Sequence, residues 1–201
     1  MIHLNQTFST RVEACVARIE SETDAEVVVV ASRKSGHYAD VVSNLSFAVS
    51  LLAILALSLL PWHVSPLFVV LDVIVVWTLA RALLDHPSVI RMATRAERRD
   101  HQVQRAAQAE FHAEAVHGTP SRTGLLVYVS GLEQQVVLVP DAGLESRIPR
   151  GRWAAAQREF SHNDLDHFLS GLEHIGALLS DALPRTEEPR QNLTDAPRIR
   201  P

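Results

Sequence analysis

The residues best suited to chemistry lie at the ends of two predicted strands. Asp141 ends one strand and is followed by Gly143, and Arg122 and Thr123 come directly before the other strand. A carboxylate at a strand end can hold a cation or cap the next helix, and a glycine can supply a turn conformation. Arg122 and Thr123 can line a cleft or fix the entry into the strand. These four residues are the candidate binding site; no cofactor is assigned, and a divalent cation at Asp141 is the alternative.

Two other groups have reactive or ligand-type atoms without the spacing of a known motif. Residues 162–167 read His-Asn-Asp-Leu-Asp-His, and the simplest prediction is that Asp164 caps a helix. Cys15 lies on an apolar helix face and is predicted to be a buried thiol. The sequence has no GxxxxGK[ST] loop, no HExxH motif and no G-x-S-x-G motif. No catalytic residue and no metal ligand is therefore assigned.

Asp72 is a carboxylate within a long apolar stretch. Residues 41–71 contain no Asp, Glu, Lys or Arg, and the apolar sequence resumes after Asp72. An unpaired carboxylate at this depth of a membrane is costly, so Asp72 should be neutral or paired. Three alternatives are open: a tolerated side chain that snorkels to the interface, a hydrogen bond to the neighbouring helix with Ser58 favoured, or a contact with a second chain.

The apolar stretch predicts two transmembrane helices, residues 41–60 and 66–84, because about 20 apolar residues cross roughly 30 Å of hydrocarbon. The connecting loop of this hairpin contains no Lys or Arg. Basic residues instead lie before the first helix and at or after the end of the second: Arg33, Lys34, Arg81, Arg91, Arg95, Arg98 and Arg99. The distribution predicts a two-pass protein of the inner (plasma) membrane with both termini cytoplasmic.

The net charge of the 201-residue chain is -4. Without a net basic balance, the arginines after the hairpin are better explained by topology and by anionic lipid headgroups than by nucleic acid. The single cysteine excludes an internal disulfide. The lipid bilayer is thus a predicted partner and nucleic acid is not.

The soluble sequence alternates helices and strands. Residues 26–32 are β-branched and apolar, which is typical of a strand covered on both faces. Residues 123–130 and 135–140 predict an antiparallel hairpin. Apolar residues at helical spacing predict a helix that ends before Thr23 (Phe8, Val12, Cys15, Val16, Ile19) and a second helix from a Ser88 cap to about His117 (Ala96, Val103, Ala107, Phe111). A third helix is expected from Leu144, with an interruption at 149–151. The last is expected from Asp164 to Pro184.

This order makes the hairpin an insertion after the first strand of one α/β domain. Residues 1–40 form the first part of that domain, 41–84 the transmembrane hairpin and 85–183 the second part. Residues 184–201 are rich in proline and poor in apolar residues, so a disordered tail is expected.

Several segments together resemble a known family: residues 22–23 (Glu-Thr), 26–30, 122–130 (Arg-Thr-Gly-Leu-Leu-Val-Tyr-Val-Ser), 136–143 (Val-Val-Leu-Val-Pro-Asp-Ala-Gly), Phe111 and Trp153. They are similar to the TPM domain family, and close to its small bacterial membrane members. The resemblance implies an α/β/α sandwich. Plant relatives are associated with acid phosphatase activity, and bacterial members often occur beside LemA-type membrane proteins, which implies such a partner.

Phosphatase-associated members usually carry an acidic segment ahead of the first helix, whereas residues 1–6 contain no carboxylate. We therefore expect a non-enzymatic, membrane-anchored TPM-like module that binds other envelope membrane proteins, or a second copy of itself, and assists their assembly or maintenance. The alternative is a metal-assisted phosphatase with its site near Asp141.

Overall fold

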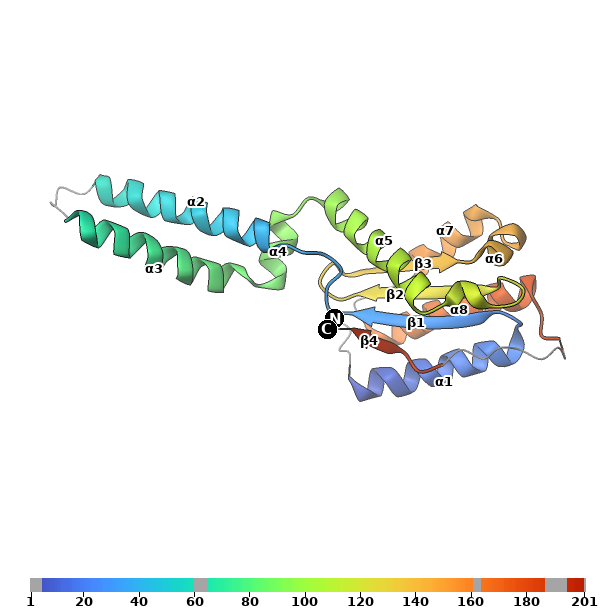
Figure 1. The fold of residues 1–201 in the computed structure, drawn as a ribbon. Helices are drawn as coiled ribbons and strands as arrows, with labels where there is room; N and C mark the ends of the chain where they lie inside the picture. The colour runs from blue at the N-terminus through green and yellow to red at the C-terminus, as the bar shows by residue number, and fades with distance from the viewer. Residues whose placement is uncertain (1–4, 60–64, 161–163, 187–194, 201) are drawn as a thin grey trace. The chain divides into compact units, whose positions relative to one another are not determined.

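The structure is a computed structural model that describes residues 5–59, 65–160, 164–186 and 195–200. It contains two compact units, traced along the chain in Figure 1. The α/β unit comprises residues 1–35 and 100–201, and the helical unit comprises residues 36–99. The chain therefore leaves the α/β unit after Ser35 and re-enters it at Asp100.

The helical unit is built around a pair of apolar helices. Helices α2 (Ala39–Ser58) and α3 (Pro66–Leu84) lie side by side, and both are long and apolar enough to span a membrane. Pro66 begins α3, where the missing N–H of proline is harmless. The short helix α4 (Pro87–Ala93) follows. The two predicted apolar helices are thus present, although residue 60 lies outside the described residues.

Four strands form one sheet in the order β3-β2-β1-β4. Their bounds are β1 Glu26–Ser32, β2 Gly124–Ser130, β3 Gln135–Pro140 and β4 Arg198–Arg200. β1 pairs in parallel with β2 and β4, and β2 pairs antiparallel with β3. The predicted first strand and the predicted antiparallel hairpin are confirmed, and every residue of β1 is buried, as its apolar sequence indicates.

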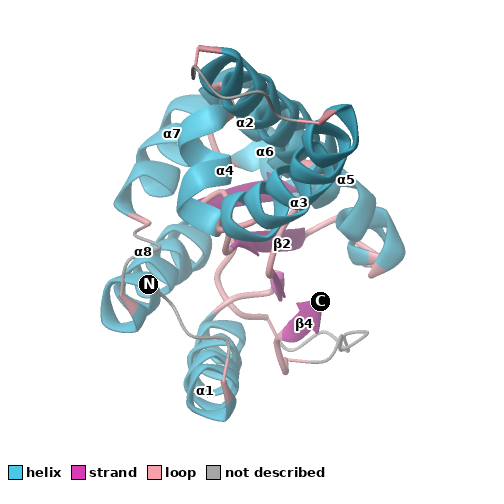
Figure 2. Cartoon of the chain, turned by 90° about the vertical axis from the view of Figure 1, so that its left-hand side faces the viewer, coloured by secondary structure: helices cyan, strands magenta, loops and turns pink. Residues whose placement is uncertain are grey.

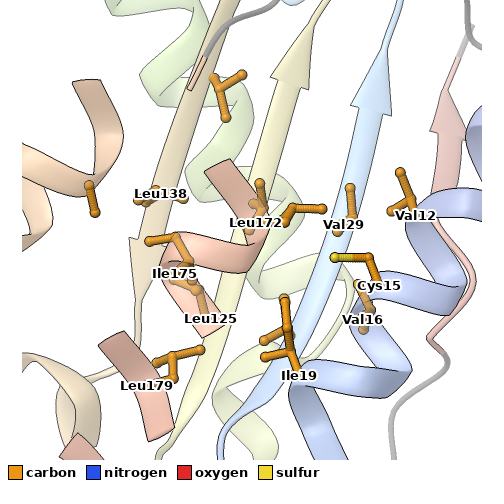
Figure 3. Packing of buried hydrophobic residues seen from close by; sticks show 14 of the residues in the cluster. Val12, Cys15, Val16, Ile19, Val29, Leu125, Leu138, Leu172, Ile175 and Leu179 are labelled. Atoms are coloured by element: carbon orange, nitrogen blue, oxygen red, sulfur yellow. The ribbon is translucent and has the colours of Figure 1, made fainter. Parts of the chain in front are cut away.

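One face of the sheet packs against α1 (Gln6–Glu22) and α8 (Leu165–Ala182). Val27, Val29 and Ala31 of β1 belong to this core. Figure 3 shows side chains of both helices packed with those of the strands: Val12, Cys15, Val16, Ile19, Leu172, Ile175 and Leu179 with Val29, Leu125 and Leu138. The thiol of Cys15 is buried as predicted, and burial raises its pKa.

Two short helices complete the same core. α6 (Ala142–Arg147) adds Leu144, and α7 (Arg150–Glu159) adds Trp153 and Ala156. The predicted interruption between these helices is present, because Pro149 precedes α7 in an extended conformation and has no N–H for a helical hydrogen bond.

The opposite face of the sheet packs against α5 (Ala96–Ala113) and the short 3-10 helix η1 (Val116–Gly118). Val28 and Val30 of β1 point to this side and share a second core with Val103, Ala107 and Phe111. Figure 2 shows α1 and α8 on one side of the strands and α5 on the other. The sheet is therefore covered on both faces, which explains why β1 has no polar face.

The single helix predicted over residues 88–117 is wrong, because Thr94 has an extended backbone that separates α4 from α5. The Arg99 side chain donates to the carbonyl of Arg91 and, at 2.9 Å, to that of Thr94, which satisfies the end of α4. The backbone N–H of Ser88 donates to the ring of His86, so Ser88 is not the cap. Of the predicted stripe, Ala96 is exposed and the other three residues are buried.

The predicted disordered tail is wrong for residues 198–200, which form β4. This strand pairs with residues 30–32 of β1. Its two arginines make ion pairs with Glu110 and Glu114. Backbone pairing and ion pairs hold this strand in place. Its sequence is poor in apolar residues, so the apolar pattern did not predict a strand there. Residues 187–194 and 201 of the tail lie outside the described residues.

Ile19→Ala should destabilise the α/β unit by about 2–5 kcal/mol, because Ile19 is buried between α1 and the sheet. Trp153 follows the inserted helices in the sequence, and its fluorescence should report the loss of stability. The measurement is denaturant unfolding followed by Trp153 fluorescence in a chain whose other tryptophans are replaced by phenylalanine.

Ala17→Ser, at an exposed position of α1, is the matched control and should change stability by less than about 0.5 kcal/mol. An unchanged Trp153 transition in Ile19→Ala would mean that the segments before and after residues 36–99 do not share one core.

Candidate functional site

Asp141 lies directly after β3, at the start of α6. The residue is 3% exposed. One carboxylate oxygen accepts a hydrogen bond from the Ala142 N–H at 2.7 Å. The Arg122 guanidinium donates to both oxygens, from Nε to Oδ2 and from Nη2 to Oδ1, each at 2.8 Å. Asp141 is therefore a helix cap and one half of a bidentate ion pair.

Arg122 has an unusual backbone for a side-chain-bearing residue, with φ at 55°. This left-handed conformation costs roughly 1 kcal/mol or more outside glycine and persists only where neighbours hold it. The Arg122 N–H donates to Thr119 at 3.0 Å, and its carbonyl accepts from the Gly143 N–H at 2.8 Å. The side chain and the backbone of Arg122 thus clamp the start of α6 from two directions.

Gly143 is required by close packing and not by its backbone angles, since the described glycines have no positive φ. A Cβ atom at this position would lie 2.4 Å from the carbonyl oxygens of both Ser121 and Arg122. The prediction that Gly143 supplies a turn conformation is therefore wrong. Its role is to let the first turn of α6 approach the chain that enters β2.

Thr123 is buried one residue further along the chain. Its N–H donates to the Thr119 hydroxyl at 2.9 Å, and its own hydroxyl donates to the Asp24 carbonyl at 3.2 Å. The structure thus brings the four predicted residues together at one edge of the sheet, where β1 and β2 begin and β3 ends. We call Arg122, Thr123, Asp141 and Gly143 the Asp141 corner.

The chemistry available at the Asp141 corner is limited by its own hydrogen bonds. Both carboxylate oxygens are occupied by donors from Arg122 and Ala142. Coordination of a cation by Asp141 would have to displace them. In open α/β sheets, ligands bind beyond the carboxyl ends of the parallel strands, and the Asp141 corner is at the amino ends of β1 and β2.

The carboxyl ends of β1 and β2 carry a polar network that the sequence did not reveal. It consists of Ser35, Tyr128, Ser130 and Glu133, the carboxyl-end cluster. The Ser35 hydroxyl lies 2.9 Å from the Tyr128 hydroxyl and 2.7 Å from the Ser130 hydroxyl. The Ser130 hydroxyl donates to the Glu133 carboxylate, which also accepts from the Ser35 N–H at 3.1 Å.

Three members of the carboxyl-end cluster are buried, and Ser35 is half-buried. Burial raises the pKa of Tyr128, although hydrogen bonds from Ser35 and Ser32 oppose the shift. The network therefore joins the turn between β2 and β3 to the segment that follows β1. It fixes the point at which the chain leaves the α/β unit. No sequence motif marks these residues; the parallel register of β1 and β2, which sets Ser32 opposite Ser130, brings their strand ends together.

Glu20 is a second polar residue that the sequence did not single out. Within the described residues β4 pairs with residues 30–32 of β1, and the Val27 N–H, further back on β1, donates to the Glu20 carboxylate at 2.8 Å. Burial raises the pKa of Glu20 to about 8; the Val27 hydrogen bond lowers it, and the nearby Glu26 and Asp195 carboxylates raise it further. The raised pKa favours the protonated form of Glu20, and its side chain shares a hydrogen bond with Asp195.

The His-Asn-Asp-Leu-Asp-His segment falls partly on residues 162 and 163, which lie outside the described residues. Asp164 occupies the cap position of α8, but its side chain makes no capping hydrogen bond there. Instead it lies 3.2 Å from the ring of His167, and this contact lowers the pKa of Asp164.

Asp72 lies in the N-terminal half of α3 and is half-buried. The Arg81 side chain of α3 donates to the Ser43 hydroxyl of α2 at 2.7 Å. The Ser58 hydroxyl donates to carbonyls of its own helix. Among the described residues the structure records no hydrogen bond between Ser58 and Asp72, so the favoured hydrogen bond to the neighbouring helix is not formed.

Gly143→Ala should lower stability by about 1–3 kcal/mol, because the new methyl group meets two backbone oxygens that cannot move freely. Gly151→Ala is the matched control: this glycine also lies in a first helical turn, but no atom lies within 4 Å of the place its methyl group would take, so alanine should stabilise by up to about 1 kcal/mol. Thermal unfolding in detergent compares them. Equal melting temperatures would contradict the close packing at the Asp141 corner.

Glu20→Gln should flatten the dependence of stability on pH. In the wild type the pKa of Glu20 rises from 4.5 in the unfolded chain to about 8 in the folded one. The contribution of the protonated side chain is complete below pH 4.5 and is lost as pH rises through 8. The steepest slope is about 1.4 kcal/mol per pH unit for one proton, reduced here because the side chain is partly exposed.

Unfolding free energies at about pH 5 to 9 test this prediction. Glu13→Gln, an exposed change on the same helix, should keep the wild-type pH dependence. Parallel curves for Glu20→Gln and the wild type would show that Glu20 does not retain a proton.

Comparison with known proteins concerns the fold. No protein-family model matches the chain, and no curated protein matches it. Among solved structures, the chain is similar to the NMR structure of BA42 protein from the psychrophilic bacterium Bizionia argentinensis. The TM-score is 0.58 at 13% sequence identity, over 98% of this chain and 96% of BA42. The mixed α/β fold thus has a solved bacterial counterpart.

Proposed function

We propose that the chain is a membrane-anchored, TPM-like module. The hairpin of α2 and α3 spans the inner membrane, both termini are cytoplasmic, and the protein binds another membrane protein and assists its assembly or maintenance. The observation that carries the proposal is the reversed polarity of the hairpin, in which apolar side chains face outward.

Large apolar side chains are exposed along both helices of the hairpin. Examples are Phe47 at 60%, Leu52 at 64%, Leu67 at 66% and Phe68 at 65% exposure. Soluble proteins rarely expose contiguous apolar surface of this extent. The helices contain 20 and 19 residues, which is enough for about 30 Å of hydrocarbon at 1.5 Å per residue.

The seam between the helices is lined by small and polar residues. Ser46 and Ser50 of α2 are 0% and 2% exposed, and Ala80 is the buried residue of α3. Each serine hydroxyl donates to a carbonyl of its own helix, at 2.7 Å and 3.0 Å. Small residues let membrane helices approach closely, and internal hydrogen bonds satisfy their polar atoms in lipid. Small residues inside and apolar residues outside are typical of a membrane hairpin.

The end of the hairpin near Arg81 has the residues of a cytoplasmic interface. The Arg81 guanidinium lies 5.6 Å from the centre of the Trp77 ring and bonds to Ser43. Arg98 forms a bidentate ion pair with Asp40 at 2.8 and 2.9 Å. Tryptophan and arginine together mark the headgroup region, and arginine favours the cytoplasmic side. These contacts support the proposed orientation.

A structural role fits the Asp141 corner better than phosphatase activity. A metal-assisted hydrolase needs a carboxylate with oxygens directed at a cation, and both oxygens of Asp141 are held by protein donors. The ion pair with Arg122 and the capping of α6 account for this carboxylate as a structural group.

Asp72 is the feature of the hairpin that supports a partner within the membrane. It is half-buried on the α3 face that includes Val69, Val76 and Ala80. Within the described residues the structure gives its carboxylate no hydrogen bond. A carboxyl group at this depth needs a donor or acceptor, and a second membrane chain can supply one. A LemA-type protein or another copy of this chain has the required location.

Asp72→Leu should weaken association with the partner while leaving insertion intact. One hydrogen bond between membrane helices is worth roughly 0.6–2 kcal/mol, so recovery of partners should fall about threefold or more. The measurement is crosslinking and co-purification from gently solubilised membranes at matched expression, with two differently tagged copies to detect self-association. Alkaline extraction of the membranes checks insertion.

Thr78→Leu is the matched control, because Thr78 is an exposed polar residue of α3 whose hydroxyl donates to its own helix. It should recover partners as the wild type does. Equal recovery for Asp72→Leu would leave Asp72 as a tolerated side chain, and release of the wild-type chain by alkali would overturn the membrane anchor.

A further inference from the structure

The junction between α4 and α5 contains buried polar atoms without a partner. Among the described residues, Arg91 Nη1, Arg99 Nε and Thr94 Oγ1 are buried and make no hydrogen bond. The Thr94 side chain belongs to a residue that is 5% exposed. Leaving a guanidinium donor buried and unpaired is costly, so an acceptor from outside the chain is favoured at this place.

The three residues lie together because Arg99 is folded back onto the end of α4. Its Nη1 donates to the carbonyl of Arg91 and to that of Thr94. This leaves its Nε for a further acceptor. One guanidinium thus serves both the protein backbone and an external group.

Charge indicates that the missing acceptor is an anion. In the described part of the helical unit, the ion pair that the structure records joins Arg98 to Asp40. Arg91 and Arg99 have no carboxylate partner there, and the nearby Arg95 is exposed. Arginine presents several N–H donors in a planar fork that suits phosphate oxygens, and a threonine hydroxyl can donate to the same group.

We propose that Arg91, Thr94 and Arg99 form a binding site for the phosphate of an anionic phospholipid. The inference rests on the proposed insertion of α2 and α3, since only Asp85 and His86 separate the end of α3 from the start of α4. The junction therefore follows a membrane span closely in the chain. Met92, which follows Arg91 directly, is 89% exposed and offers an apolar side chain to the bilayer.

The test measures lipid retained by the full-length chain purified in mild detergent. The lipids are phosphatidylglycerol and, as the zwitterionic comparison, phosphatidylcholine; native mass spectrometry counts the bound molecules. The wild type should retain phosphatidylglycerol in preference. Arg91→Gln should reduce this retention about tenfold or more, because it removes a charge-assisted hydrogen bond to the phosphate as well as a charge. Thr94→Val should also reduce it, and this variant does not change the charge.

Arg95→Gln is the matched control, because it removes the same charge from an exposed neighbour. It should reduce retention by at most about fivefold, since an exposed arginine contributes only diffuse attraction to an anionic surface. Arg99 is left unchanged in the main test, because its contacts with two carbonyls also hold the end of α4. Equal losses in Arg91→Gln and Arg95→Gln would show diffuse attraction and overturn the site.

Two further measurements distinguish a lipid phosphate from free phosphate, and failure of the lipid site from failure of the membrane anchor. Millimolar inorganic phosphate or glycerol phosphate should not compete with the lipid, and full competition by either would overturn the assignment to a phospholipid. Alkaline extraction tests insertion independently. A chain that resists extraction but shows no preference for phosphatidylglycerol would refute this site alone, whereas a chain released by alkali would refute the membrane anchor on which it rests.

Discussion

The burial of β1 on both faces is the constraint on which the α/β unit depends. All seven residues of the strand are buried, and alternate side chains enter two different cores. The residues described before Gly36 supply one helix, α1, to cover them. The second face, both neighbouring strands and the helix α8 come from residues after 100. A strand without a polar face is stable only if these distant segments return to it, so the inserted hairpin has to leave and re-enter without disturbing the sheet.

The two ends of β1 have different hydrogen-bond partners, because the strands on its two sides differ in length. β2 runs along the full strand, but β4 covers only its last three residues. At the uncovered end a side chain, Glu20, accepts the Val27 N–H and retains a proton because it is buried near other carboxylates. At the covered end Ser35 and Glu133 join the departing chain to the β2–β3 turn. Unpaired backbone groups at a strand edge thus account for polar contacts that resemble functional sites.

Local patterns predicted the elements well wherever one physical signal dominated. The apolar spans, the strand at 26–32 and the antiparallel hairpin all have continuous or periodic apolar sequences, and the structure contains each of them. The errors arose where tertiary contacts decided the outcome. Thr94 breaks a helix with the help of Arg99, and β4 is held by pairing with β1 and by ion pairs. Neither contact has a local signature in the sequence.

The candidate site shows the same division. The sequence selected Arg122, Thr123, Asp141 and Gly143 from their positions beside strands, and the structure brings them to one edge of the sheet. It did not predict that they would satisfy one another. That distinction matters for function, because a polar group with all its hydrogen bonds made has little to offer a ligand. The helical unit has the opposite arrangement, with a half-buried carboxylate in α3 and buried donors at the α4–α5 junction that lack partners among the described residues. Buried polar groups without a partner in their own chain are accounted for when a group outside the chain forms the missing hydrogen bonds. The physical case for interaction at the helical unit is therefore stronger than the case for catalysis at the Asp141 corner.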